Sequence, residues 1–350
     1  MPVAWRLVVA TVGAIVAPAV ASGFLQVAGA TAVDRPLRSS VSVQPMMPRT
    51  MRVIRGTFRN AAGERSYALH LPDGAAPAGG RPLVVMLHGC TQDADDIARG
   101  TRLHEVAGAR GWMVLYPEQP LALNPKKCWN WFDAAHQRRD AGEPSLIAGM
   151  TAHVVAEHGG DASRVFLGGI SAGAAMASLV AAAYPEQYAA LALHSGLVHG
   201  AARTVMDAVS VMQRGVPSPE PFGEAAFAAM GSHSRIVPTL VIHGESDAVV
   251  APINGAQAAK QWFLTNAMAK GQVLDTTSGG TDRVVTEEGG YRVTRSTYRA
   301  KDGMPLSWLV MVRELGHAWS GGSPDGSFTD ARGPSASALV VDFFATQGRR

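Results

Sequence analysis

A serine between two glycines is the first feature of the sequence that could carry chemistry. Residues 169–173 read Gly-Ile-Ser-Ala-Gly, with Ser171 at the centre of a G-x-S-x-G pattern. A β-type run, residues 164–168, precedes the pattern, and a stretch of good helix formers, residues 172–183, follows it. A serine on a sharp turn between a strand and a helix is well placed to act as a nucleophile. We therefore predict that Ser171 is a nucleophile.

A serine hydroxyl attacks poorly until a base takes its proton, so this hypothesis requires a histidine and a carboxylate further along the chain. Asp247 follows the apolar run 239–243, and His317 follows the apolar run 308–312. The order Ser, Asp, His matches that of hydrolases with a nucleophile on such a turn. We predict His317 as the base and Asp247 as the acid that orients it. Glu245 is the rival carboxylate.

Ester or amide hydrolysis also needs N–H donors for the oxyanion of the tetrahedral intermediate. One donor in this arrangement is the backbone N–H after the nucleophile, here Ala172. The other comes from the loop after an early strand, and the apolar run 83–87 leads into such a loop, residues 88–91. We predict Cys90 as this second donor.

The only two cysteines, Cys90 and Cys128, are expected to form a disulfide if the chain is exported. The alternative is two unpaired, buried thiols. A bridge would bring Trp129 and Trp131 near Ser171, where apolar rings could line a substrate groove. For each ring the alternative is packing in the core, as is usual for large aromatic side chains.

The order of elements predicts an α/β fold. From about residue 50, apolar runs alternate with Ala-rich stretches, which is typical of parallel strands separated by helices. The six apolar runs are residues 83–87, 112–116, 164–168, 191–194, 239–243 and 308–312. Residues 51–59 and 65–71 indicate an antiparallel hairpin at the N-terminal edge. We expect a mostly parallel central sheet flanked by helices, the α/β-hydrolase fold, in one catalytic domain over residues 51–348. Residues 199–237 are either a small cap or helices that pack against the sheet flank.

The N-terminus has the pattern of an export signal. Arg6 precedes an apolar stretch, residues 7–21, that ends in Ala-Val-Ala, and Ala-Thr-Ala at residues 30–32 is a second possible cleavage site. We predict a signal peptide over residues 1–32, a linker over residues 33–50, and an extracellular or periplasmic protein. An uncleaved membrane anchor is the alternative.

Composition excludes other classes of function. Lys and Arg number 31 against 28 Asp and Glu, and basic residues form no run longer than a pair, so no nucleic-acid partner is expected. No stable membrane partner is expected either. Two cysteines cannot make a structural zinc site, and the motifs H-E-x-x-H and C-x-x-C are absent from the sequence, so no metal site is predicted.

Six segments share motifs with a known family: residues 87–92, 128–132, 169–176, 194–197, 243–247 and 316–322. Together they resemble the polyhydroxybutyrate (PHB) depolymerase-type esterase family, with its feruloyl and acetylxylan esterase relatives. The resemblance implies an α/β-hydrolase fold, a triad of Ser171, Asp247 and His317, Cys90 in the oxyanion loop, and ester hydrolysis without a metal or organic cofactor.

The sequence departs from this family in a few places. Ala174 stands where a glycine is expected, and Glu245 stands where the family more often has Asp. The chain ends at Arg350, soon after the last expected helix, without the linker and polymer-binding domain of extracellular depolymerases. This departure argues against attack on a solid polyester.

The predicted function is a secreted serine esterase that hydrolyses short-chain or 3-hydroxyacyl oligomer esters through an acyl-enzyme. Alternatives are a true PHB depolymerase, a feruloyl or acetylxylan esterase, an acyltransferase that uses the same residues, and a non-catalytic binding protein on the same fold. The expected partner is an ester substrate, small, oligomeric or polymeric. The sequence predicts no oligomeric state.

Overall fold

The computed structural model describes residues 50–272 and 281–348. All of them belong to one of the two units into which the chain divides, residues 46–350. The predicted signal peptide and all but the last residue of the predicted linker lie outside the described residues. No helix within the described part of the chain is long and apolar enough to cross a membrane.

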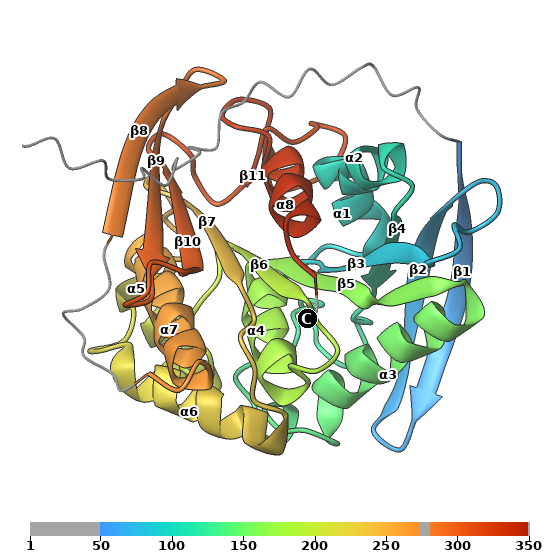
Figure 1. Cartoon of the computed structure of the whole chain (residues 1–350), viewed down its shortest axis with the longest axis horizontal. Helices are drawn as coiled ribbons and strands as arrows, with labels where there is room; N and C mark the ends of the chain where they lie inside the picture. The colour runs from blue at the N-terminus through green and yellow to red at the C-terminus, as the bar shows by residue number, and fades with distance from the viewer. Residues whose placement is uncertain (1–49, 273–280, 349–350) are drawn as a thin grey trace, which may run out of the picture. The chain divides into compact units, whose positions relative to one another are not determined.

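A ten-stranded sheet crosses the described part of the molecule (Figure 1). The strand order is β1-β2-β4-β3-β5-β6-β7-β10-β9-β8. The six strands from β4 to β10 in this order are parallel, and an antiparallel pair lies at each edge. The strands are β1 (Met51–Asn60), β2 (Gly63–Pro72), β3 (Arg81–Leu87), β4 (Met113–Pro117), β5 (Gly160–Ile170), β6 (Ala190–His194), β7 (Thr239–Gly244), β8 (Thr281–Glu288), β9 (Tyr291–Arg299) and β10 (Pro305–Val312).

The expected fold is confirmed, with one addition. The predicted N-terminal hairpin is β1–β2, and the six predicted apolar runs are the six parallel strands. The pair β8–β9 at the other edge was not predicted. Its first strand is mostly exposed and mixes charged residues with valine, so it lacks the continuous apolar run by which buried strands are recognised.

Helices cover both faces of the sheet (Figure 1). Helices α1, α2 and α8 lie on one face, and α3, α4, α6 and α7 lie on the other. The α-helices are α1 (Ala94–Thr101), α2 (Leu103–Ala109), α3 (Gly142–Glu157), α4 (Ala172–Ala183), α5 (Val205–Arg214), α6 (Glu220–Met230), α7 (Ile253–Ala269) and α8 (Ala336–Ala345). Short 3₁₀ turns, η1 (Ala134–His136) and η2 (Gly231–His233), and a two-stranded parallel pair, β11 (Trp319–Ser320) and β12 (Thr329–Asp330), complete the described elements.

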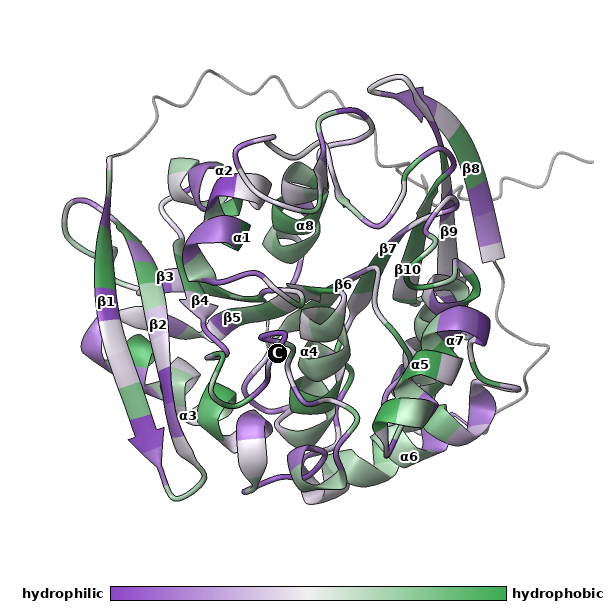
Figure 2. Ribbon diagram, turned by 180° about the vertical axis from the view of Figure 1, so that it is seen from behind, coloured by the Kyte–Doolittle hydropathy of each residue, from purple (hydrophilic) through white to green (hydrophobic). Residues whose placement is uncertain are grey.

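The core has two layers, one on each face of the sheet, because successive side chains of a strand point to opposite faces. In β3, Leu83, Val85 and Leu87 belong to the cluster under α3, α4 and α7, whereas Val84 and Met86 belong to the cluster under α2 and α8. Figure 2 shows hydrophobic residues concentrated in the central strands and in α4. Strands buried on both faces read as the continuous apolar runs from which they were predicted.

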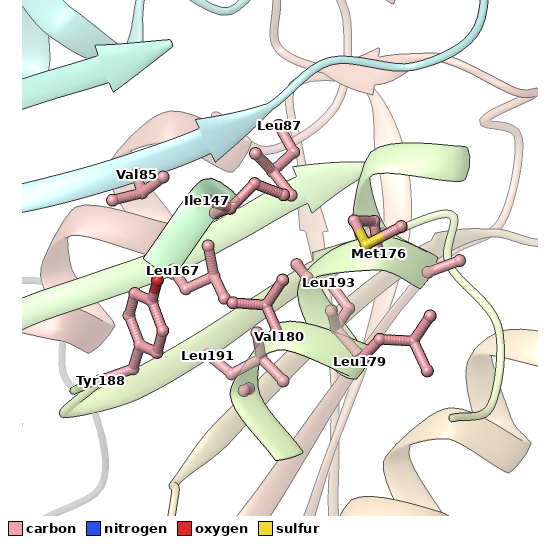
Figure 3. Packing of buried hydrophobic residues seen from close by; sticks show 14 of the residues in the cluster. Val85, Leu87, Ile147, Leu167, Met176, Leu179, Val180, Tyr188, Leu191 and Leu193 are labelled. Carbon is pink, nitrogen blue, oxygen red and sulfur yellow. The ribbon is translucent and has the colours of Figure 1, made fainter. Parts of the chain in front are cut away.

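Helix α4 is buried on every side, and all of its residues are buried. In Figure 3 its side chains Met176, Leu179 and Val180 pack over Leu167 of β5 and Leu193 of β6. A helix that is apolar all round belongs inside a protein. This packing holds the N-terminus of α4, and with it the turn that carries Ser171, at the centre of the sheet.

The stretch 199–237 contains helices α5 and α6. Helix α6 packs against α4 and α7, which agrees with the alternative of helical packing on the sheet flank. Helix α5 is attached to the loop after β7, where the Ala251 N–H donates to Met212 O at 2.7 Å. Three apolar side chains of α5, Val205, Met206 and Val209, are exposed.

Candidate active site

Ser171 sits on a tight turn between β5 and α4. Its backbone has φ 56° and ψ −123°, a conformation that residues other than glycine rarely adopt. A Cβ on Gly169 would lie 2.4 Å from the backbone of Gly173, and a Cβ on Gly173 would lie 2.3 Å from Leu87 O. Both glycines of the motif are therefore required, because β3, β5 and α4 approach too closely for any side chain there.

Asp247 and His317 are in direct contact. His317 Nδ1 lies 2.7 Å from Asp247 Oδ2, and both side chains are largely buried. Asp247 follows β7 and His317 follows β10, and these strands are parallel neighbours, so their carboxyl ends bring the two loops together. Glu245, the rival carboxylate, is exposed, and His317 bonds to Asp247 instead.

The Asp247 carboxylate is held as an anion. Its Oδ1 accepts hydrogen bonds from the N–H groups of Val249 at 2.9 Å and Val250 at 2.8 Å. Burial by itself raises the pKa of Asp247, but hydrogen bonds from His243, His317 and Val250 outweigh burial, and the pKa falls well below its ordinary value. A carboxylate that stays ionised can orient an imidazole and balance its charge when the imidazole gains a proton.

His243 is a second histidine that holds the same carboxylate. Its ring is fully buried at the end of β7, and Nε2 lies 2.9 Å from Val250 O and 3.4 Å from Asp247 Oδ2. Because a carbonyl oxygen only accepts, Nε2 carries the proton. The ring thereby fastens both ends of the short loop from Asp247 to Val250.

His194 connects the serine turn to the histidine loop. Its backbone oxygen accepts from the Ser171 N–H at 2.9 Å, and its Nε2 accepts from the Ser320 N–H at 3.4 Å. The ring stacks on Trp319 with a centroid separation of 4.8 Å. Burial lowers the pKa of His194 to about 3, so the imidazole is neutral and can accept from Ser320.

The loop after β3 lies against the serine. A Cβ on Gly89 would be 3.4 Å from Ser171 Cβ. His88 Nε2 accepts from the Gln119 N–H at 3.0 Å, so the proton is on Nδ1, which donates to Gly89 O at 2.7 Å. Because Gly89 O and the Cys90 N–H belong to one trans peptide, His88 directs that N–H away from itself. Within the described residues this N–H has no partner in the chain.

The predicted disulfide between Cys90 and Cys128 is present. It links the loop after β3 to a segment that a buried carboxylate holds in place. Glu143 Oε2 accepts from the Asn130 N–H at 2.8 Å, and Glu143 Oε1 accepts from Gln119 Nε2 at 2.6 Å. Arg65 Nη2, also buried, lies 3.2 Å from the same Oε1 and balances the charge. The positions on both sides of the disulfide are thus restrained.

The structure corrects the prediction for Trp129 and Trp131. Trp129 is 0% exposed and Trp131 is 4% exposed, and both belong to the core cluster under α4. A ring without accessible surface offers no wall to a ligand, so core packing, the alternative considered from the sequence, describes both rings. The disulfide does bring this segment near the serine, but its aromatic rings turn inward because the apolar core is there.

Sequence reasoning missed Phe328 altogether. Its ring centroid lies 6.2 Å from that of His317, at an interplanar angle of 78°. Phe328 lies outside the six motif segments, so no motif in the sequence pointed to it.

The described residues contain no group of three or more His, Cys, Asp or Glu side chains arranged to hold a metal ion.

The chain is similar to several known esterases. Poly(3-hydroxyalkanoate) depolymerase C of Paucimonas lemoignei is 33% identical over 262 residues, which cover 74% of this chain and 60% of that protein. Feruloyl esterase B of Neurospora crassa is 34% identical over 213 residues, 58% of this chain and 70% of that protein. This chain therefore aligns with only part of each relative.

The solved structure of an acetyl xylan esterase from Aspergillus awamori superposes with a TM-score of 0.60 at 23% identity, covering 77% of this chain and 94% of that chain. This likeness shows the fold alone. The profile of the family described as "Esterase PHB depolymerase" matches residues 65–284, a segment that includes Ser171 and Asp247 and ends before His317. Because this match covers more than half of the sequence, the chain belongs to the esterase PHB depolymerase family, on an α/β-hydrolase fold.

Proposed function

We propose that this chain is a serine esterase that hydrolyses carboxylic esters through an acyl-enzyme. The observation that carries the proposal is the 2.7 Å contact between His317 Nδ1 and Asp247 Oδ2 at the carboxyl ends of β7 and β10. The carboxyl end of β5, with Ser171, belongs to the same edge of the parallel sheet. A paired imidazole and carboxylate at the same sheet edge as a serine on a strained turn suits nucleophilic acyl transfer.

In the proposed reaction, Ser171 Oγ attacks the ester carbonyl carbon while His317 Nε2 takes the hydroxyl proton. Asp247 keeps the opposite nitrogen, Nδ1, protonated and stabilises the imidazolium. The oxyanion accepts from the backbone N–H groups of Cys90 and Ala172, the latter at the first position of α4, where the helix itself offers no carbonyl partner.

The tetrahedral intermediate then collapses. The bond between the carbonyl carbon and the alcohol oxygen breaks, and His317 returns its proton to the departing alcohol. Water repeats the sequence on the acyl-enzyme: His317 takes its proton, the acid is released, and Ser171 Oγ regains a hydrogen. The original serine proton leaves with the alcohol and a proton from water replaces it, so the enzyme is regenerated and the cycle consumes only ester and water.

Labelling with a fluorophosphonate, coupled to hydrolysis of p-nitrophenyl butyrate, tests the proposal. The probe should attach to Ser171, and Ser171→Ala should lose both labelling and turnover. Ser163→Ala is the matched control, because Ser163 is exposed near the other end of β5. Labelling of the Ser171→Ala variant to the same extent as the unmodified protein would refute the assignment, and failure of the probe to attach to the unmodified protein would favour a binding protein on the same fold.

For substrates, we infer soluble short-chain or 3-hydroxyacyl oligomer esters. The relatives carry names that point to polyhydroxyalkanoates, feruloyl esters and acetylated xylan, so family membership leaves the acyl group open. A side-by-side panel of p-nitrophenyl esters, a feruloyl ester, acetylated xylan and amorphous PHB separates these classes. Faster turnover of amorphous PHB than of every soluble ester would favour a true depolymerase, and ester products from an added alcohol acceptor would favour acyl transfer.

We also propose that residues 51–348 act as a catalytic domain exported behind the signal peptide, to the periplasm or the medium. The sequence pattern of residues 1–32 and the Cys90–Cys128 bridge support this location, since disulfides persist in oxidising compartments. N-terminal sequencing of the protein from each cell fraction tests it. A chain that retains residue 1 and stays in the cytoplasm would contradict export.

A further inference from the structure

Phe328 combines exposure with a strained backbone. Its side chain is 43% exposed, and within the described residues it is the one exposed Phe, Tyr or Trp. Its φ is 53°, a left-handed conformation that is a genuine outlier for a bulky residue. Such strain persists only where the surroundings enforce it, and it gathers at sites that bind ligands. An apolar ring held in water at an unfavourable φ calls for a functional explanation.

The residues on both sides of Phe328 are held firmly. Ser327 N–H donates to Asp96 Oδ1 at 3.0 Å, and Thr329 pairs with Trp319 in the β11–β12 ladder. The carbonyl of Phe328 itself accepts from the Trp319 N–H at 2.7 Å. The ring position therefore follows from bonds to α1 and to the strand that begins two residues after His317.

The loop before Phe328 is pressed against the end of α1. A Cβ on Gly326 would lie 2.4 Å from the backbone of Gly100, and the Ser323 N–H donates to Gly100 O at 2.8 Å. Backbones this close leave little room for the loop to shift. Phe328 is thus presented in one place, which suits a contact that must select among substrates.

The same segment is tied to the proposed oxyanion loop through one side chain. Gln92 Nε2 donates to Ser327 O at 3.1 Å, while Gln92 Oε1 accepts from the Gly89 N–H at 3.0 Å. On its other side Phe328 meets His317, ring edge to ring face, at 6.2 Å between centroids. Phe328 consequently stands between the loop of Cys90 and the proposed base.

We propose that Phe328 forms an apolar wall for the alcohol part of the ester. This inference rests on the proposed function. In acylation His317 gives its proton to the departing alcohol oxygen, so the alcohol part leaves beside the imidazole. Phe328 places an exposed apolar ring edge-on to that imidazole, and in this proposal the ring contacts the carbon attached to the ester oxygen. The enzyme consequently prefers esters of aromatic or branched alcohols over methyl esters.

Two series of esters test this assignment. In one, butyrates of methanol, butanol and benzyl alcohol vary the alcohol, and in the other, ethyl esters of acetic, butyric and hexanoic acid vary the acyl group. Phe328→Ala should lower kcat/KM for benzyl butyrate by about 10-fold and for methyl butyrate by less than about 2-fold, the range expected for losing an apolar pocket contact. Ratios within the acyl series should not change.

Phe328→Gly separates the ring from the backbone, because glycine adopts φ 53° without strain. It should lose the same alcohol preference as Phe328→Ala, and its Tm should be equal to or higher than that of Phe328→Ala. Val53→Ala, at an exposed position on β1, is the control for loss of an exposed apolar side chain and should leave both series unchanged.

Equal losses of kcat/KM across all alcohols would overturn the assignment. A changed acyl preference with the alcohol preference intact would also overturn it and would place Phe328 on the acyl side. Failure of the proposed function looks different. In that case the unmodified protein hydrolyses neither series, or Ser171→Ala remains as active as the unmodified protein, and the inference about Phe328 fails with it.

Discussion

The two sides of Ser171 are built differently. On the side of the proposed acid and base (the acid–base side), residues 243–250 and 314–320, the loops meet through hydrogen bonds around one carboxylate, Asp247. On the side of the proposed oxyanion donor (the oxyanion side), residues 88–92 and 128–130, a disulfide and a buried ion pair of Arg65 and Glu143 restrain the chain. In the proposed mechanism the first side accommodates a proton that comes and goes, whereas the second keeps an N–H donor still. We infer that each kind of restraint suits its task, and substitutions can test this comparison.

The largest effects are expected on the acid–base side. Ser171→Ala and His317→Ala should each lower kcat by about 10⁴-fold or more, because the members of a triad act as a unit, and Asp247→Asn should cost as much or less. Glu245→Gln is the matched control in the same loop and should keep most of the activity. Steady-state kinetics measure all four variants. An inactive Glu245→Gln beside an active Asp247→Asn would reassign the acid.

On the oxyanion side, the tryptophans should affect stability rather than substrate binding. Trp129→Ala should lower the free energy of unfolding by about 3–5 kcal/mol, because the ring is fully buried, and should leave KM of the folded fraction unchanged. Trp129→Phe is the milder control, since Trp129 Nε1 has no hydrogen-bond partner to lose among the described residues. Urea titration and kinetics on the same preparations measure both quantities. A raised KM without a loss of stability would return Trp129 to the groove.

Breaking the disulfide should lower the catalytic rate more than the affinity for substrate. The double variant Cys90→Ser with Cys128→Ser should lose about 2–4 kcal/mol of stability. Its kcat should fall by about 10-fold with KM nearly unchanged, because the oxyanion exists only along the reaction. Thiol titration of the unmodified protein, denatured but not reduced, should find no free sulfhydryl. An unchanged kcat in the folded double variant would mean that the bridge restrains the chain without aiding the Cys90 donor.

A further effect concerns the pH dependence of stability. Burial lowers the pKa of His88 and of His199 from 6.5 to about 4, and that of His194 to about 3. Between these values and 6.5 the unfolded chain binds more protons than the folded chain. The free energy of unfolding should therefore fall as the pH drops from about 6.5 toward 4, by at most about 1.4 kcal/mol per pH unit for each histidine.

His88→Gln should reduce the slope of the unfolding free energy against pH by the contribution of about one proton. It should also lower kcat, because the Gly89–Cys90 peptide loses the hydrogen bond from His88 Nδ1 that orients it. His153→Gln, at an exposed position on α3, is the control and should change neither. Urea titrations at several pH values measure the slope. A slope in His88→Gln equal to that of the unmodified protein would show that His88 is not among the groups that titrate on unfolding.

Local sequence was sufficient where one segment carries all the information. The run 164–183 encodes strand, turn and helix in succession, so it predicted the turn of Ser171 between β5 and α4. The apolar runs predicted the six parallel strands because strands buried on both faces need continuous hydrophobicity. The Cys90–Cys128 pairing also followed, since the chain has only two cysteines.

Tertiary structure decided every feature that depends on how distant segments meet. Only the order of the strands makes β7 and β10 neighbours and so brings Asp247 to His317. The packing of the fold places Trp129 in the core. The sequence could not decide this, because a tryptophan beside Cys128 has the same local pattern whether its ring faces a core or a groove. Phe328 lies in a polar loop with no periodic pattern, and its contact with His317 arises from a ladder between β11 and β12 that no local signal encodes. Sequence periodicity reports how one element faces the core, whereas contacts between loops depend on the packing of elements far apart in the chain.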